Sequence, residues 1–111
     1  MDRLQTRVNS SDASFDSNHA HNSALLATLR ERLEVAQQGG GGKYVDKHRS
    51  RGKALPRERI SAICDPGTPF LELSPLAAFE LYDGKAASAG MVTGIGVVHG
   101  KECLFVANDA T

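Results

Sequence analysis

The sequence predicts a mixed α/β fold, of the α+β type within its 111 residues, in which helices come first and a β-hairpin comes last. A leucine-containing stripe after residue 22 and a helix that starts at a proline near residue 56 predict the helical part. Two β-rich runs that a glycine turn separates predict the hairpin. Apolar residues make up 41% of the chain and fall almost entirely after residue 23, so we expect one modest core.

The first part of the chain changes character near residue 22. Residues 1–21 are mostly polar, which predicts a disordered lead because too little apolar surface is available to offset the entropy of ordering. A helix is predicted over 22–38, capped by Asn22 or Ser23 and ended by Gly39. Its apolar stripe consists of Leu26, Leu29, Leu33 and Ala36. An isolated helix of this length is marginal in water, so we expect it to dock on another subunit or on the domain core.

Residues 39–53 are predicted to form a glycine-rich and basic linker, which opens with four consecutive glycines. Between Lys43 and Arg59 seven basic residues face two acidic ones, a local charge of about five positive units (7 − 2). Residues 54–111 are predicted to begin a larger domain of which this chain carries only the first part.

A short helix is predicted over about 56–64. Pro56 suits the first helical position because it lacks the amide hydrogen that would go unbonded there, and Glu58 lies in the first turn, where carboxylates are favoured. The sequence Asp65-Pro66-Gly67 ends the helix by turn chemistry.

Three extended segments follow this helix. Residues 70–73 are expected to form a short one, and Met91–Val98 and Glu102–Ala107 the two arms of the hairpin, with the turn at 99–101. Both arms are apolar at successive positions, as in strands that are covered on both faces. A hairpin alone cannot be covered in that way, so we expect neighbours that this chain does not encode.

Two glycine patterns resemble nucleotide-binding motifs without matching them. Gly42 and Lys43 lack both the leading glycine and the following hydroxyl residue of a phosphate-binding loop. Gly94, Gly96 and Gly100 depart from the dinucleotide fingerprint, because the third glycine comes one place late and no helix pattern follows. We expect the strand glycines to permit close packing instead.

No metal site or catalytic constellation is predicted. Cys64 and Cys103 lie far apart without a CxxC pair, which indicates reduced, packed thiols and an intracellular compartment. His19 and His21 lie in the polar lead without further ligands. Basic and acidic residues balance at 13 each and no apolar run of membrane length occurs, so neither nucleic acid nor a membrane is expected as a partner.

Arg49, Arg51 and Lys53 form the one cluster with a physical case for binding. They lie just before a helix start, where free amides and the helix dipole favour an anion such as a phosphate group. The alternative, a solvated or intersubunit ion-pair face, stays open.

Three blocks of the sequence, in the same order, resemble a known family. They are RERLEVAQQGGGG, RGKALPRERISAICDPGTPFLELSPLAA and VTGIGVVHGKECLFVANDAT, within residues 24–111. They are similar to the start of the carboxyltransferase β subunit of biotin-dependent acyl-CoA carboxylases, with the 3-methylcrotonyl-CoA carboxylases nearest. Leu55 is a departure, because many relatives place a helix-capping Thr there.

The resemblance implies a crotonase-like carboxyltransferase domain that opens with helices and a hairpin. It implies a ligase in which carboxybiotin donates the carboxyl group, biotin takes the proton from the acyl-CoA, and backbone amides stabilise the thioester oxyanion. Those amides would fall after residue 111, so no catalytic residue is assigned here and the 111-residue polypeptide alone is expected to be inactive. Arg49, Arg51 and Lys53 become candidates for contacts with the phosphates of CoA.

The resemblance also implies substrates and partners. The expected substrate is 3-methylcrotonyl-CoA, from leucine degradation; the alternatives are geranyl-CoA or propionyl-CoA, or a non-catalytic interaction module. Biotin would be carried by a partner α subunit, the β subunits would form a homo-hexamer, and no metal is expected in this chain. The expected compartment is the bacterial cytoplasm, or the mitochondrial matrix if the source is eukaryotic.

Overall fold

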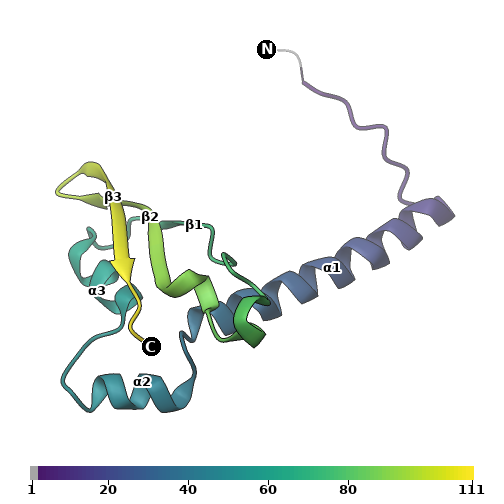
Figure 1. Ribbon diagram of the computed structural model, residues 1–111. Coiled ribbons are helices and arrows are strands. Elements are labelled where there is room, and N and C mark those ends of the chain that lie inside the picture. The colour runs from purple at the N-terminus through teal and green to yellow at the C-terminus, as the bar shows by residue number, and fades with distance from the viewer. Residues whose placement is uncertain (1–2) are drawn as a thin grey trace. The chain divides into compact units, whose positions relative to one another are not determined.

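The computed structural model describes residues 3–111, and at Ala87 the backbone alone. The chain divides into two units, the residues up to Glu31 and residues 32–111. Figure 1 labels its main elements, which are α1 (Ala13–Gln37), α2 (Gly42–Arg49), α3 (Pro56–Ile63), β1 (Leu71–Leu73), β2 (Met91–Val98) and β3 (Lys101–Asn108). Two short turn segments with left-handed backbone inside them, Leu81–Gly84 and Ala87–Gly90, lie between β1 and β2.

Helix α1 begins at Ala13, earlier than the predicted start at residue 22. The carboxylate of Asp12 accepts a hydrogen bond from the amide of Ser14 at 2.9 Å, and its backbone carbonyl accepts one from Phe15 at 2.9 Å. Asp12 is therefore an N-cap, and this local cap starts a helix in a polar segment that composition alone assigns to disorder. For residues 3–12 disorder stays a prediction, and residues 1–2 lie outside the described residues.

Helix α2 lies inside the segment predicted to be a linker, 39–53. Gly41 precedes it with φ of 93°, a conformation that glycine adopts without steric cost. Three basic residues, Lys47, His48 and Arg49, occupy its last turn, where positive charge complements the helix dipole. The charge that suggested a solvated linker therefore also suits a short helix.

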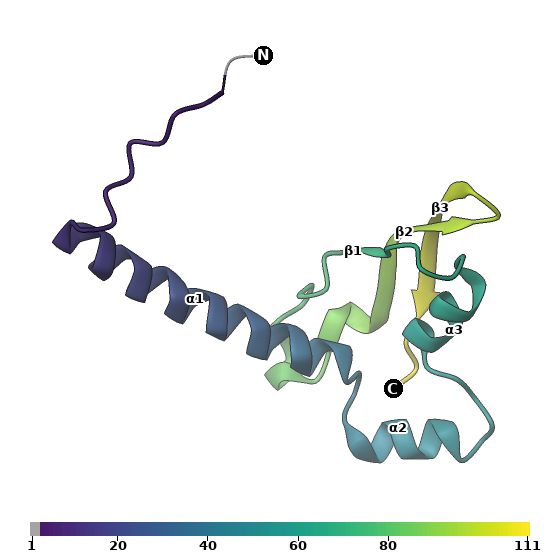
Figure 2. The ribbon, with the colours of Figure 1, turned by 180° about the vertical axis from the view of Figure 1, so that it is seen from behind.

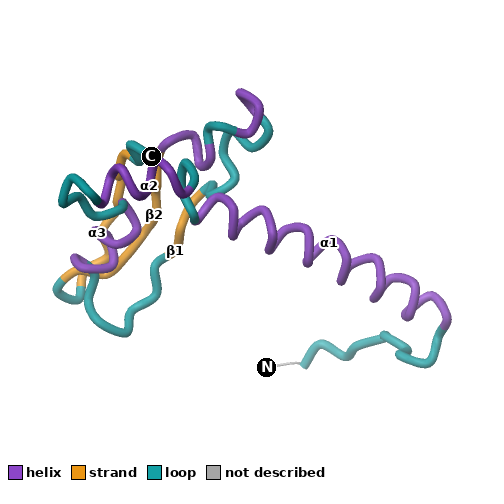
Figure 3. The backbone as a smooth tube through the Cα atoms, turned by 90° about the horizontal axis from the view of Figure 1, so that it is seen from below, coloured by secondary structure: helices purple, strands orange, loops and turns teal. Residues whose placement is uncertain are grey.

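The strands form an antiparallel sheet in the order β1-β2-β3, drawn in orange in Figure 3. Strands β2 and β3 pair from Met91 with Asn108 to Val98 with Lys101, which leaves a two-residue turn. Its residues, His99 and Gly100, have φ of 50° and 74°, the positive pair that type I′ turns require. The predicted hairpin is confirmed, and β3 begins at Lys101, which the prediction had placed in the turn.

One face of the sheet, the covered face, packs against α3, as Figures 1 and 2 show. Val92 is fully buried on this face, and Ile60 of α3 is 4% exposed. The rings of Phe70 and Phe105 meet edge to face, with centroids 5.9 Å apart. The small core of residues 32–111 therefore lies between α3 and this face.

Two glycines let the covered face approach its neighbours closely. A Cβ atom on Gly94 would clash with the ring of Phe70 and lie 2.6 Å from the carbonyl oxygen of Leu71. A Cβ atom on Gly96 would lie 2.6 Å from Sγ of Cys64. The prediction that these glycines permit close packing is confirmed.

The opposite face, the open face, has no cover among the described residues. It carries Leu71 at 61% exposure, Leu104 at 70% and Val106 at 63%, together with Leu73, Met91 and Ile95. Cross-strand pairing sets Leu71 beside Ile95 and Ile95 beside Leu104. The expectation that the strands are apolar on both faces is confirmed, but α3 covers only one of them.

Candidate functional site

Arg57, in the first turn of α3, forms the main polar contacts inside residues 32–111. Its Nε and Nη2 atoms donate to the two carboxylate oxygens of Glu72 on β1, at 3.0 and 2.6 Å. Both side chains are largely covered, with 23% and 17% exposed. A bidentate ion pair fixes the relative orientation of its two side chains as well as their distance, so it holds α3 and β1 in one orientation.

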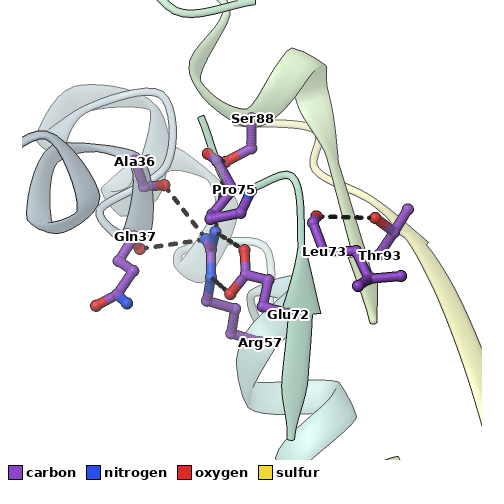
Figure 4. Close-up of polar contacts among 8 residues, drawn as sticks. All are labelled: Ala36, Gln37, Arg57, Glu72, Leu73, Pro75, Ser88 and Thr93. Atoms are coloured by element: carbon purple, nitrogen blue, oxygen red, sulfur yellow. Dashed lines mark hydrogen bonds and ion pairs between the residues drawn. The ribbon is translucent and has the colours of Figure 1, made fainter. Parts of the chain in front are cut away.

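The same guanidinium also contacts the end of α1 and the segment before β2 (Figure 4). Its Nη1 atom donates to the carbonyl oxygens of Ala36 at 3.3 Å and Gln37 at 3.5 Å, two of the acceptors that a helix leaves free at its end. Its Nη2 atom lies 3.4 Å from Oγ of Ser88, which donates to the carbonyl of Pro75 at 2.9 Å. Arg57 therefore has a structural role and leaves little of its charge for a ligand.

A carboxylate caps the N-terminus of α3. Glu58 accepts a hydrogen bond from the amide of Leu55 at 2.8 Å and forms an ion pair with Arg49 of α2. The hydrogen bond from the Leu55 amide is the main cause that lowers the pKa of Glu58 below its ordinary value, and the hydrogen bond from Arg49 is the second. Leu55 has no side-chain acceptor, so Glu58 alone supplies the reciprocal half of a capping box. The helix start therefore already holds a negative charge.

The three predicted phosphate-binding residues lie in different environments. Arg49 is paired with Glu58. Arg51 is exposed in the loop after α2. Lys53 is exposed as well, and it lines a cleft between this loop, α3 and the end of β3. The structure therefore brings one of the three, Lys53, to a concave surface.

This basic cleft has a volume of about 690 Å³. Lys53, Arg59 and His48 supply its basic groups, and none of the described residues that line it is acidic. Arg59 Nη2 donates to the carbonyl of Asn108 at 3.2 Å, and His48 Nε2 lies 3.2 Å from the carbonyl of Ala54. The residues of α3 and β3 that border it are Ile60, Ile63, Phe105, Val106 and Ala107, of which Ile60 is a core residue, 4% exposed, and Val106 belongs to the open face.

Sequence reasoning did not single out Arg59 and His48. Arg59 was counted in the basic run, but its place in the cleft depends on where the end of β3 lies against α3. The only signal in the sequence was the excess of positive charge itself.

Asp65 joins the end of α3 to the hairpin turn. Its carboxylate accepts hydrogen bonds from the amides of His99 at 2.8 Å and Gly100 at 2.7 Å, and its own amide donates to Val97 at 2.8 Å. The hydrogen bond from the Gly100 amide is the main cause that lowers the pKa of this carboxyl, and the one from the His99 amide is the second. Asp65 was predicted only to end the helix; it also positions the hairpin.

The part of the chain that the structure describes contains no metal site and no membrane-spanning helix. Over residues 3–111 no three His, Cys, Asp or Glu side chains converge as a metal site would require. Cys64 and Cys103 are free thiols, each half-buried. Among the helices described, none has both the length and the apolar character that a membrane crossing needs.

Comparison with known proteins identifies the family. The model of the carboxyl transferase domain matches residues 47–111, which include α3 and the whole sheet. The mitochondrial methylcrotonoyl-CoA carboxylase beta chain of Arabidopsis thaliana is 46% identical over 108 residues, 97% of this chain and 18% of that protein. This chain thus spans about a fifth of the length of such relatives.

Solved structures give the same family. The beta subunit of P. aeruginosa geranyl-CoA carboxylase matches 96% of this chain and 20% of its own, with a TM-score of 0.77 and 33% identity. The transcarboxylase 12S hexamer, solved with hydrolysed methylmalonyl-coenzyme A bound, matches 76% of this chain and 17% of its own, with a TM-score of 0.67 and 29% identity. Because the carboxyl transferase domain model matches residues 47–111, more than half of the chain, and these relatives match nearly all of it, the chain belongs to the carboxyl transferase family.

Proposed function

We propose that this chain supplies the N-terminal segment of a carboxyltransferase β subunit, which transfers the carboxyl group of carboxybiotin to an acyl-CoA. The observation that carries the proposal is the match to the carboxyl transferase domain over residues 47–111, the stretch that forms α3, the sheet and the basic cleft. The whole activity requires the remaining four fifths of such a subunit, which this chain does not span.

The acyl-CoA is 3-methylcrotonyl-CoA, an intermediate of leucine degradation. Its support is the 46% identity to a protein named as a methylcrotonoyl-CoA carboxylase beta chain, over nearly the whole of this chain. Geranyl-CoA is the second candidate, favoured by the 33% identity and TM-score of 0.77 to a geranyl-CoA carboxylase subunit. Propionyl-CoA is the third, and the experiment below separates the three.

The described residues offer no site for biotin itself. The polar side chains in the interior, Arg57, Glu72 and Ser88, already bond to one another and to backbone carbonyls. Biotin is carried by a partner α subunit, as the resemblance to biotin-dependent carboxylases implies, and we assign no step of the transfer to a side chain of this segment. The oxyanion-stabilising amides belong to other segments of the subunit.

This segment contributes to binding of the CoA phosphates. Lys53 reaches the basic cleft, and Arg51 lies in the same exposed loop. Arg49 acts indirectly, because its pair with Glu58 ties the end of α2 to the start of α3 and so orients the loop between them.

The complete subunit assembles as a homo-hexamer, for which the transcarboxylase 12S hexamer among the structural relatives is the support. It works in the bacterial cytoplasm or in the mitochondrial matrix. The relative from Arabidopsis thaliana is named as mitochondrial, which supports the second compartment for a eukaryotic source.

A chimera tests the function. Residues 3–111 replace the matching segment of the Arabidopsis beta chain, and the chimera is produced together with the biotin-carrying subunit of that enzyme. Biotin-dependent carboxylation is then measured with 3-methylcrotonyl-CoA, geranyl-CoA and propionyl-CoA. We expect the chimera to carboxylate 3-methylcrotonyl-CoA at roughly a tenth of the parent rate or more, because a tenfold loss corresponds to only about 1.4 kcal/mol of activation free energy. The 111-residue chain alone is the control and should show none.

Two outcomes would change the assignment. A chimera that prefers geranyl-CoA or propionyl-CoA would replace the substrate. A chimera that assembles with its partner and yet carboxylates nothing, beside an active parent, would favour the interaction-module alternative, in which α1 and the basic residues only bind another subunit.

A further inference from the structure

We propose that Gly39, Gly40 and Thr111 are positioning residues for the carboxyl transfer. Together they form a clamp, the exit clamp, that holds the chain where it leaves β3 and so fixes the place from which the complete subunit continues. Its part in the transfer rests on the proposed function, and its geometry on contacts within residues 32–111. The sequence pattern assigned the glycines to a linker and did not select Thr111.

The glycine run after α1 contacts the segment that follows β3, and the C-terminus lies beside this run in Figures 1 and 2. The amide of Gly40 donates to the hydroxyl oxygen of Thr111 at 3.0 Å. A Cβ atom on Gly40 would overlap the carbonyl group of Thr111, and one on Gly39 would lie 2.6 Å from the Thr111 hydroxyl oxygen. Nothing lies within 4 Å of the Cβ positions of Gly41 and Gly42. Close approach therefore requires glycine at two of the four positions.

A chain of hydrogen bonds continues from this contact. The hydroxyl of Thr111 donates to the carboxylate of Asp109 at 2.6 Å, and the Thr111 amide donates to the same oxygen at 2.9 Å. The amide of Asp109 donates to the carbonyl oxygen of Gly90, just before β2, at 2.8 Å. Because the Thr111 hydroxyl is an acceptor and a donor at once, its two bonds strengthen each other. The segment after β3 is therefore bonded to two other segments of the fold.

Arg59 of α3 adds a third contact, from its Nη2 atom to the carbonyl oxygen of Asn108 at 3.2 Å. Asn108 is the last residue of β3 and pairs with Met91 at the start of β2. The backbone at 108–111 is thus held by α3, by the start of β2 and by the glycine run. In the complete subunit the residues after Thr111 begin from this fixed point, and a displacement of about 1 Å can lower a catalysed rate by roughly 100-fold.

Hydrogen exchange in the 111-residue chain tests the clamp without reference to any reaction. Thr111→Val removes the hydroxyl and keeps the shape, so the amide of Gly40 should exchange about five-fold faster, the effect of losing one hydrogen bond. Thr111→Ser keeps the hydroxyl and should restore most of the protection. Amides within β2 are the internal control and should change less than about two-fold.

Steady-state kinetics of the chimera tests the positioning role. Gly40→Ala should lower kcat about ten-fold or more, while KM for the acyl-CoA changes less than about three-fold because Gly40 lies outside the basic cleft. Thr111→Val should lower kcat as well, and Thr111→Ser should recover most of that loss. Gly42→Ala is the matched control and should stay within about two-fold of the unmodified chimera. Rates are taken per assembled enzyme, and thermal unfolding of each variant measures stability separately.

Three results would overturn the exit clamp or its role. The first is equal exchange of the Gly40 amide in the wild-type chain and in Thr111→Val. The second is equal kcat for the Gly40→Ala and Gly42→Ala chimeras. The third is a lower unfolding temperature with unchanged kcat per assembled enzyme, which would show a purely structural contact. A protected Gly40 amide beside an inactive unmodified chimera would instead remove the proposed function, and with it the role in transfer, while the clamp itself would stand.

Discussion

The two faces of the sheet differ in how closely they are covered and in the side chains that β2 presents to them. The covered face has Gly94 and Gly96 at its centre, and a Cβ atom on either would collide with Phe70 or Cys64. The open face carries large aliphatic groups around Ile95, the residue between these two glycines, with its strand partners Leu71 61% and Leu104 70% exposed. The cover therefore restricts side-chain size locally: Phe70 and Cys64 approach β2 so closely that only glycine fits at positions 94 and 96, whereas the open face carries apolar side chains that no described residue covers.

The largest expected effect comes from overfilling the covered face. Gly94→Ala should lower the free energy of unfolding by about 3 kcal/mol, because the added methyl group meets the ring of Phe70 and the Leu71 backbone, which cannot move aside easily. Urea denaturation measures this. Gly42→Ala is the matched control, since nothing lies within 4 Å of its Cβ position, and it should be neutral or slightly stabilising. Equal effects would mean that the covered face is loosely packed.

The polar edge of the covered face comes next. Arg57→Met should lower the free energy of unfolding by about 1–2 kcal/mol, because it leaves Glu72 without its partner; partial exposure of both groups reduces the cost below that of a fully buried pair. Arg49→Met removes a pair with 55% and 46% of its side chains exposed and should cost clearly less than Arg57→Met, because solvent screens the two charges. Thermal unfolding of both variants, with a double-mutant cycle at Glu72, tests this, and a larger loss at Arg49 would contradict it.

The contribution of the Asp65 contact with the hairpin turn to stability should be lost only in acid. Its pKa in the folded state lies below the ordinary 3.8, so the ionised carboxylate stabilises the fold above about pH 4, and this contribution disappears as pH falls through the lowered value. Asp65→Asn should therefore flatten the dependence of stability on pH below 4, as measured by unfolding at several pH values. Glu34→Gln on the exposed side of α1 is the control. An unchanged acid slope in Asp65→Asn would show that the hairpin turn does not depend on this charge.

The smallest effect is expected on the open face. Leu104→Ala should change the free energy of unfolding by less than about 0.5 kcal/mol, because its side chain is 70% exposed. The matched change Val92→Ala on the covered face should cost about 2 kcal/mol, because Val92 is fully buried. If Leu104→Ala were as costly as Val92→Ala, the open face would be covered in solution, and sedimentation would then reveal a larger assembly.

Local chemistry made much of residues 54–111 predictable. Pro56 and Glu58 begin α3 as expected, and the two β-rich arms pair around His99 and Gly100. The same reasoning missed the start of α1 at Ala13, because the cap at Asp12 outweighed the polar composition of the residues that follow it. It also missed α2, because glycine and positive charge are common to linkers and to the ends of short helices.

The site was predicted only in part. The sequence pointed to a cluster of positive charge before α3 and selected Lys53, which the cleft includes. It also selected Arg49, because nothing in the sequence says that Glu58 turns back to pair with it. Arg59 could not be chosen from spacing, since its role depends on the position of β3, more than 40 residues later in the chain.

The sequence by itself indicated α3, the two arms of the hairpin and the family resemblance, because turns, caps and alternating side chains act between near neighbours along the chain. Only the tertiary structure decided which charges are paired and which are free, and which face of the sheet α3 covers. Those outcomes depend on contacts such as Arg57 with Glu72 and Asp65 with the hairpin turn, which join segments separated in the sequence and exist only once the sheet has formed.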